Sequence, residues 1–549
     1  MTGSVGASFR QRGATVRAFL AGCVRIDTRA LAVFRIAVAL LILADLALRA
    51  RNFSYFYTET GVVPRALATE AAPVDVGSTT LSIYHLSTDP TVTTALFVVH
   101  GLIAVLLLVG YETRLATLLS FLFVVSLDLH NPLVLSYADT LFMWLLFWAI
   151  FLPLGERWSI DAVHATHEPK PAVSSVASAL ILGQMIVMYV VNGYHKVQSD
   201  LWRSGDAAVL ILGLDDTTFL LGDVTRSVPT LLRYGGLVWF GMLLFAWMLI
   251  VLRGRPRILA VGAFAMVHVS FALTVRIGAF AYVAIAGLLL FLQSQFWDDC
   301  GTLARRIDID RRLPVDRTTL EAYRTGLESS QPKLEAIASV VPHRRQLFSR
   351  ETFGTLLRRR FSNETGMRPA AVALLSLIVV ASLVAAGGVV TDAEPEQRVT
   401  DAATMVVDHQ TEWSIFAPNP RTTDRYYVFA AETTAREQLD VYNDRPLTFD
   451  RPYDELQRQY GTYRERFYMS KLGSGEPAGL EDRLAEYVCR EWAESNDDEL
   501  TRLVMYRVDE AVTLETIDAP EDRDRTVVEL HRYGCGENEA GDVGTPPTE

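Results

Sequence analysis

The sequence predicts a polytopic α-helical membrane protein of about nine spans with a C-terminal extracytoplasmic α+β domain. Half of the 549 residues are hydrophobic, and they gather in long runs with few charges. Such runs match the roughly 20-residue helix that crosses a bilayer. Charge is divided unevenly, because residues 391–549 hold 36 acidic and 17 basic residues whereas residues 1–390 are net basic. A chain of this length also favours more than one domain.

The expected spans correspond to the apolar runs along the chain. The first run, LAVFRIAVALLILADLAL, comes after a polar segment that contains five arginines and no recognisable cleavable signal peptide, so this span itself is expected to direct insertion. The third span is the shortest and ends in DLHNP. The nine expected spans are about 30–48, 93–110, 114–129, 138–154, 176–195, 235–252, 258–275, 279–296 and 370–390.

Basic loops set the expected orientation in the cell membrane. The arginine-rich N-terminus is expected in the cytoplasm, and alternation of the spans places RGRPR (253–257) on the same side. The acidic C-terminal part then lies outside the cell. The expected domains are a helical membrane module (1–296), a charged cytoplasmic helical segment (297–369), a last span (370–390) and an outer α+β domain (391–549).

The outer part has its own patterns. TEWSIFAPNPRTTDRYYVFAAE (411–432) predicts strands joined by a turn at APNP, and ELTRLVMYRVDEAVTL (499–514) predicts a strand pair. LEDRLAEYVCREWAESN (480–496) has helical spacing. Cys489 and Cys535 can form a disulfide if this domain faces an oxidising space; two unrelated thiols are the alternative.

Lysine is rare in this chain, which makes Lys196 a candidate site residue. Four lysines stand among 51 basic residues, and the other 47 are arginine. Lys196 ends an apolar run in YVVNGYHKVQSDLW, next to His195 and three residues after Gly193, which suggests close packing. An interfacial lysine can simply extend to the headgroups, but arginine does this equally well. A buried lysine can lose its proton, whereas arginine stays charged, so Lys196 is the candidate general base.

Three further polar residues interrupt apolar runs. His130 and Asn131 lie in SLDLHNPLVLSYAD, and His268 lies in the middle of a span. Polar groups at membrane depth must be paired or line a cavity. The alternatives are a hydrated loop for His130 and a structural hydrogen bond for His268. No metal site is predicted, and the acidic balance gives no nucleic-acid footprint.

Three segments in order resemble the vitamin K-dependent γ-carboxylases. GQMIVMYVVNGYHKVQSDLWRSGDA is similar to the segment of that family in which G-x-x-K follows an apolar span. HNPLVL and WSIDA are similar to its Asn/His-bearing loop and its W-S-V/I-D segment, and HVSFALTVRIGAFAYV is similar to its later H-x-x-x-x-L-x-x-I-G-x-F-x-Y span. The resemblance covers about residues 25–297, the module called the horizontally transferred transmembrane domain. WSIFAPNP is similar to the outer domain of prokaryotic relatives. The acidic, arginine-rich composition is typical of proteins from high-salt archaea, although a GC-rich genome explains the arginine bias equally well.

The resemblance implies an enzyme. In that family the lysine of G-x-x-K deprotonates a reduced quinone, whose reaction with oxygen gives a strong base that removes the γ-proton of a glutamate, to which carbon dioxide adds. Lys196 would be this base, and His130, Asn131 and His268 would line the pocket. The implied cofactor is menaquinol or vitamin K hydroquinone, with oxygen and carbon dioxide as co-substrates. The implied partners are membrane lipids and an exported protein or peptide.

Two departures leave other functions open. His195 stands where vertebrate enzymes carry a second lysine, and the outer part has no recognisable counterpart of the region that grips a propeptide. One alternative is a non-redox membrane enzyme that modifies lipids or lipid-anchored exported proteins. Another is a non-catalytic scaffold or carrier, which predicts that Lys196→Arg is harmless.

Overall fold

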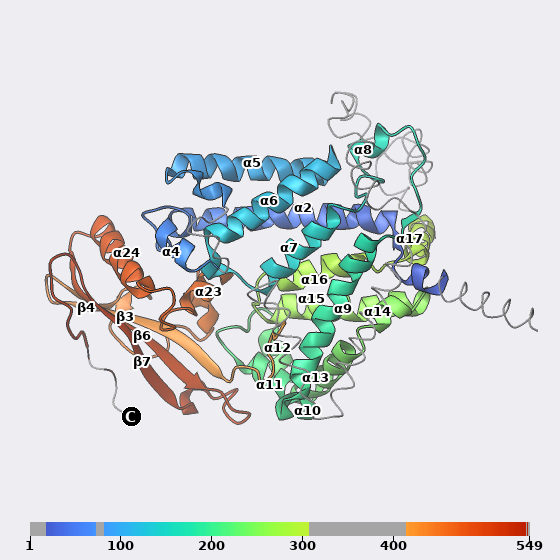
Figure 1. Cartoon of the computed structure of the whole chain (residues 1–549). Helices are drawn as coiled ribbons and strands as arrows, with labels where there is room; N and C mark the ends of the chain where they lie inside the picture. Colours follow the sequence, from blue (N-terminus) through green and yellow to red (C-terminus); the bar gives the residue numbers. More distant parts are fainter. Residues whose placement is uncertain (1–17, 73–81, 307–412, 545, 547–549) are drawn as a thin grey trace, which may run out of the picture.

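The structure, a computed structural model, describes residues 18–72, 82–306, 413–544 and 546. Figure 1 shows a body of helices, coloured blue to yellow-green, in contact with a sheet domain coloured orange to red. The helices come from the part of the chain before residue 307, and the sheet domain begins at Trp413. The predicted last span, 370–390, lies outside the described residues, as does most of the predicted segment 297–369.

Five helices in the described part of the chain are long and apolar enough to cross a membrane, and a bent pair brings the number to six at most. The prediction of about nine spans is therefore not confirmed. The five helices are α2 (Thr28–Arg51), α5 (Pro90–Val109), α6 (Thr113–His130), α9 (Val176–Val197) and α15 (Arg255–Thr274). The shorter helices of the same body are α3 (Phe53–Phe56), α4 (Arg65–Glu70), α7 (Tyr137–Ala149), α8 (Ile160–Val163), α10 (Asp200–Ser204), α11 (Asp206–Gly213), α12 (Gly222–Arg226), α13 (Pro229–Leu244), α14 (Met248–Val251), α16 (Phe280–Leu289) and α17 (Ser294–Arg306).

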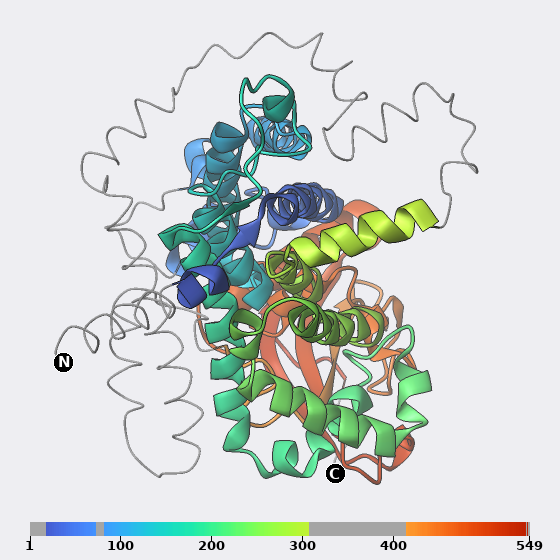
Figure 2. The same cartoon turned by 90° about the vertical axis from the view of Figure 1, so that its right-hand side faces the viewer.

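Three predicted spans differ from the helices because apolarity alone does not show where the backbone turns. In the predicted span 138–154, α7 ends at Ala149, shortly before Pro153, which cannot continue a helix. The predicted span 235–252 is divided between α13 and α14. In the predicted span 279–296, α16 ends early and the chain turns by 96° into α17, which projects from the bundle in Figure 2.

The helix starts obey capping rules. Asp27 accepts from the backbone N–H of Arg29 at the start of α2, and Ser175 forms a capping box with Ser178 at the start of α9. These side chains satisfy backbone donors that the first turn leaves without a partner. The start of each of these two spans is therefore fixed by local sequence.

The helical module has a buried centre and an apolar surface. α2 packs against α5 and α16, and α7 packs against α6, α9 and α16. Large apolar side chains are exposed on α5, α13 and α15, including Leu102, Leu231, Val238, Leu259 and Met266. Such a surface suits contact with lipid rather than water. The helices therefore indicate a membrane protein.

The C-terminal domain (413–544), which keeps the name outer domain from its predicted location, is built on an antiparallel sheet of order β5-β4-β3-β6-β7. Its strands are β3 (Thr423–Thr433), β4 (Gln438–Asp440), β5 (Arg445–Pro446), β6 (Leu500–Ala511) and β7 (Arg525–Gly534). The helix α24 (Leu480–Ser495) confirms the predicted helix and packs on β6 and β7. A disulfide joins Cys489 of α24 to Cys535, directly after β7.

Two strand predictions need correction. Among the described residues, only β3 arises from 411–432, and it begins after APNP, because Pro418 and Pro420 have no N–H to donate to a sheet. The predicted strand pair 499–514 is one long strand, β6, since no glycine or proline interrupts it. A short helix of the outer domain, α23 (Tyr463–Met469), contacts the 3-10 turn Pro132–Val134 of the helical module.

Candidate functional site

Lys196 is buried where α9 meets the segment 413–416 of the outer domain. Its Nζ donates to Ile415 O at 2.5 Å and to Phe416 O at 3.4 Å, and it lies 4.2 Å from the centre of the Trp202 ring. Trp202 Nε1 also donates to Phe416 O, at 2.8 Å. Only 1% of Lys196 is exposed. The Lys196 amino group therefore binds the outer-domain segment, a contact that the sequence did not predict.

The neighbouring side chain Asn192 supports the same segment. It lies one helical turn before Lys196, and its Nδ2 donates to Trp413 O at 2.6 Å and to Ile415 O at 3.0 Å. The segment has irregular backbone, with positive φ at Trp413 and Phe416. Buried carbonyls outside regular structure need donors, and side chains of α9 supply them here.

Gly193 allows a close helix contact, as its position beside Lys196 predicted. A Cβ at Gly193 would lie 3.0 Å from the Leu243 side chain and 3.1 Å from the Leu244 backbone. Glycine therefore lets α13 approach α9 on the face next to the Asn192 and Lys196 contacts.

His268 lies among aromatic rings in α15. Its Nε2 is 2.8 Å from Tyr189 Oη, and the ring of Trp239 has its centre 5.7 Å away. His268 is fully buried, and Tyr189 belongs to α9, two turns before Lys196. The hydrogen bond to a neighbouring helix is the structural alternative that the sequence left open.

His130 and Asn131 lie where α6 ends. The His130 ring stacks on Tyr57 with centroids 5.8 Å apart and lies 4.8 Å from the His85 ring. Asn131 Nδ2 donates to Phe56 O at 3.4 Å. These contacts are with residues 56–57 and 85, whereas Lys196 contacts Trp202 and the segment 413–416.

His195 is half-buried and contacts the ring of Tyr194. Although it is adjacent to Lys196 in sequence, it points to another side of α9, as neighbouring residues of a helix do. The structure therefore places Lys196, His130 and His268 in three different surroundings.

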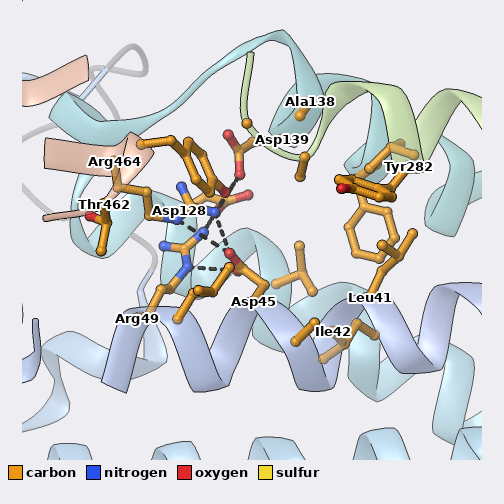
Figure 3. A pocket seen from close by; sticks show the side chains of 18 of the residues that line it. Leu41, Ile42, Asp45, Arg49, Asp128, Ala138, Asp139, Tyr282, Thr462 and Arg464 are labelled. Atoms are coloured by element: carbon orange, nitrogen blue, oxygen red, sulfur yellow. Dashed lines mark hydrogen bonds and ion pairs between the residues drawn. The ribbon is translucent and has the colours of Figure 1, made fainter. Parts of the chain in front are cut away.

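A cavity of about 440 Å³ lies between the helical module and the outer domain. Its lining comes from the second half of α2, the end of α6, the start of α7, the α15–α16 connection and the start of α23; the five predicted residues are not part of it. Figure 3 shows charged side chains at one end and Leu41, Ile42 and Tyr282 at the other. A cavity of this size and lining suits a small amphipathic molecule.

Five residues at the polar end, here named the charged cluster, are ion-paired. Arg49 contacts Asp45 at 2.7 Å and Asp128 at 2.6 Å. Arg464 of the outer domain contacts Asp45 at 2.5 Å and Asp139 at 2.9 Å. The cluster thus joins α2, α6 and α7 to α23 (Figure 3).

The charge balance of the cluster makes Arg464 important for docking. Three carboxylates share two guanidinium groups, and only 4% of the Arg464 side chain is exposed. Burial disfavours its charged form, but Asp139 and Asp45 hold the pKa of Arg464 well above its ordinary value. Removing one partner from such a cluster leaves a buried charge uncompensated, at a cost of about 3–5 kcal/mol.

His100 of α5 also lines the cavity and has one ring nitrogen unused. Its Nδ1 is 3.1 Å from Tyr84 Oη, whereas its Nε2 has no hydrogen-bond partner in the described part of the chain. His100 is 1% exposed. A neutral imidazole donates at one nitrogen and accepts at the other, so Nε2 can serve a ligand in either role according to the tautomer.

The mouth of the cavity lies on the apolar surface of the helical module. Leu48 of α2 and Tyr282 of α16 line the cavity and are 38% and 50% exposed, and Arg51 beside them is exposed as well. A molecule with an apolar tail can therefore enter from this apolar surface.

A second group of ion pairs docks the outer domain near α11. Asp215 contacts Arg226 at 2.6 Å and both Arg451 and Arg523 at 2.9 Å. Burial alone would raise the pKa of Asp215, but these three guanidinium groups hold it below its ordinary value. Asp424 of β3 accepts from the backbone N–H of Asp215 at 2.9 Å and so completes the contact.

Sequence reasoning missed the charged cluster and His100. Asp128 and Asp139 flank the HNPLV segment that the sequence did single out, and a carboxylate at membrane depth is a signal by itself. His100 interrupts an apolar run as His268 does. Arg464 gave no signal, because its partner Asp45 lies 419 residues earlier in the chain.

Comparison with known proteins gives one match. Residues 24–297 match the model of the HTTM domain. The match runs from just before α2 through the first turn of α17, and it therefore includes every helix that lines the cavity except α23. No curated protein and no solved structure matches the chain.

Proposed function

Residues 24–297 belong to the HTTM domain family, the membrane module of vitamin K-dependent carboxylase-like proteins, and on this basis we propose a function. The chain is a membrane enzyme that uses a reduced quinone and oxygen to modify an exported protein or peptide. The cavity between the helical module and the outer domain carries the proposal. It combines an apolar wall, a polar end and a mouth on the lipid side.

The residues present fit a quinone. A quinone head has two oxygens that need hydrogen bonds and a flat ring that needs apolar contacts, and its tail is soluble in lipid. Leu41, Phe142 and Tyr282 offer apolar contacts, and His100 Nε2 offers a hydrogen bond. A volume of about 440 Å³ is large enough for the head and the first part of a tail.

The residues around the cavity have separable roles. A bound reduced quinone would supply the electrons that oxygen accepts. His100 would hold one quinol oxygen and share its proton, and the charged cluster keeps α23 over the cavity. Displacement of water by the bound molecule would strengthen the polar contacts inside the cavity.

Lys196 supports a second candidate function, a non-catalytic carrier with the same cavity. In the structure its Nζ binds the carbonyls of Ile415 and Phe416 and does not line the cavity. A catalytic role for Lys196 requires its amino group to leave these carbonyls and reach the cavity. A carrier requires only that Lys196 holds the segment 413–416 in place.

The decisive experiment uses the purified full-length chain in lipid nanodiscs. Menaquinol or vitamin K hydroquinone is added in air, quinone epoxide is measured by mass spectrometry, and quinol binding is measured separately by saturation. The test variant is His100→Phe. The matched control is His531→Phe. His531 lies in β7, which contributes no residue to the cavity, and it pairs with Asp482.

The two readouts separate the candidates. Epoxide from the wild type and the control, with a loss of at least about tenfold in His100→Phe, supports the proposal, since a positioned proton-transfer group contributes roughly 10²–10⁴-fold. Saturable quinol binding without epoxide favours the carrier. If quinol does not bind saturably to the folded protein, the proposal is wrong.

A further inference from the structure

A second cavity, here named the basic cavity, lies at the other end of α2. It has a volume of about 350 Å³ and is lined at the starts of α2, α15 and α17. Arg29 lies at this end of α2, whereas Arg49 of the charged cluster lies near its other end. Twenty helical residues separate them by roughly 30 Å, about the thickness of a bilayer core. The basic cavity is therefore at the opposite end of the helical module from the outer domain.

The lining of the basic cavity carries a large excess of positive charge. Four arginines and one aspartate contribute to it, with no other charged residue: Arg25, Arg29, Arg157, Arg253 and Asp27. Arg29 is paired with Asp27 and with Asp298, at 2.9 Å in each case. The other three arginines have no carboxylate partner among the described residues.

These three arginines keep a positive charge that an anion could compensate. Arg25 is exposed and makes no side-chain hydrogen bond or ion pair with a described residue. Arg157 Nε donates to Thr28 Oγ1 at 2.8 Å, and Arg253 donates to Phe19 O, so both are held in place by neutral acceptors. Neutral acceptors leave the positive charge of each guanidinium group uncompensated.

The backbone and a buried arginine add to the positive potential. Asp27 and Gly254 are the N-caps of α2 and α15, and the positive end of each helix dipole lies at the cavity. Arg257, in the first turn of α15, does not line the cavity but lies behind Gly254, which does. It is 1% exposed and donates to Cys23 O at 3.3 Å, while its Nε and Nη2 have no partner in the described part of the chain. Such an arrangement is stable when an anion compensates it.

We propose that the basic cavity binds a phosphate group, presented either by the headgroup of an anionic phospholipid or by free phosphate. Guanidinium groups match phosphate oxygens through paired, charge-assisted hydrogen bonds. The cavity has room for a phosphate and lies at the ends of membrane-crossing helices, where lipid headgroups gather. The inference is independent of the quinone proposal, because it concerns the opposite end of the module.

The test uses the purified full-length chain and native mass spectrometry. Retention of phosphatidylglycerol is compared with that of phosphatidylcholine of the same acyl chains, and inorganic phosphate is added as a competitor. The variants are Arg25→Gln and the double substitution of Arg25 and Arg253 by Gln. Arg436→Gln is the matched control, since Arg436 is exposed between β3 and β4 and has no ion pair with a described residue. Thermal unfolding checks that each variant is folded.

Preferential retention of phosphatidylglycerol that falls about tenfold in Arg25→Gln, equivalent to about 1.4 kcal/mol, supports a lipid headgroup site. Binding of inorganic phosphate that the same variants weaken, without a preference between the lipids, supports free phosphate as the source. If the folded double variant binds phosphatidylglycerol and phosphate as the wild type does, or if Arg436→Gln weakens binding equally, the inference is wrong.

Discussion

Replacing Arg464 with methionine should weaken the docking of the outer domain on the helical module. The substitution removes ion pairs to Asp45 at 2.5 Å and Asp139 at 2.9 Å and a hydrogen bond to Val134 O at 3.2 Å. Three carboxylates of the charged cluster would then share Arg49 alone. Methionine preserves most of the apolar volume, so the electrostatic loss dominates.

The expected loss is about 3–5 kcal/mol, the cost of leaving a buried charge without its partner. For a domain of roughly 150 residues that corresponds to a decrease in melting temperature of roughly 6–20 °C. The assay is thermal unfolding of the full chain in lipid nanodiscs, combined with hydrogen exchange of α23. Arg464→Met with Asp45→Asn should recover part of the loss, because one uncompensated charge is removed.

Arg466→Met is the matched control. Arg466 lies in the same helix, and its side chain makes a hydrogen bond of 3.4 Å to Arg276 O and no ion pair with a described residue. Its substitution should change stability by about 1 kcal/mol or less. The electrostatic explanation fails if Arg464→Met unfolds within about 2 °C of the wild type, or if both variants lose the same stability.

Three other perturbations test individual contacts. If Lys196 is a base, Lys196→Arg and Lys196→Met should both abolish epoxide formation while quinol binding persists. An active Lys196→Arg variant would instead show that Lys196 serves to hold the outer-domain segment 413–416. The ion pairs of Asp215 should contribute fully above its ordinary pKa of 3.8 and be lost as the pH falls through its lowered pKa. The protection factors of amides at this contact, which correct for the slower intrinsic exchange in acid, should therefore fall at low pH, and Asp215→Asn should remove that dependence. Reduction of the Cys489–Cys535 disulfide, which closes a separation of 46 residues, should lower outer-domain stability by about 2–4 kcal/mol in thermal unfolding, and Cys489→Ser should make the reductant ineffective.

Some of the candidate site was accessible from composition. The scarcity of lysine singled out Lys196, and the structure shows it buried, with its Nζ bound to carbonyls of the outer segment. The sequence also singled out the segment around His130, whose flanking Asp128 and Asp139 belong to the charged cluster. The sequence could not show the role of Lys196, because a catalytic base and a hydrogen-bond donor to backbone carbonyls would both be a buried lysine at this position.

The sequence by itself determined the features that depend on neighbouring residues: the apolar runs of α2, α5, α6, α9 and α15, the helix α24, and the family of residues 24–297. Only the tertiary structure decided which charges meet. Arg464 and Asp45 are 419 residues apart in the chain and in contact in space. Coulomb interaction depends on distances of a few ångströms and on burial, and both are set by packing of the outer domain on the helices rather than by position in the sequence.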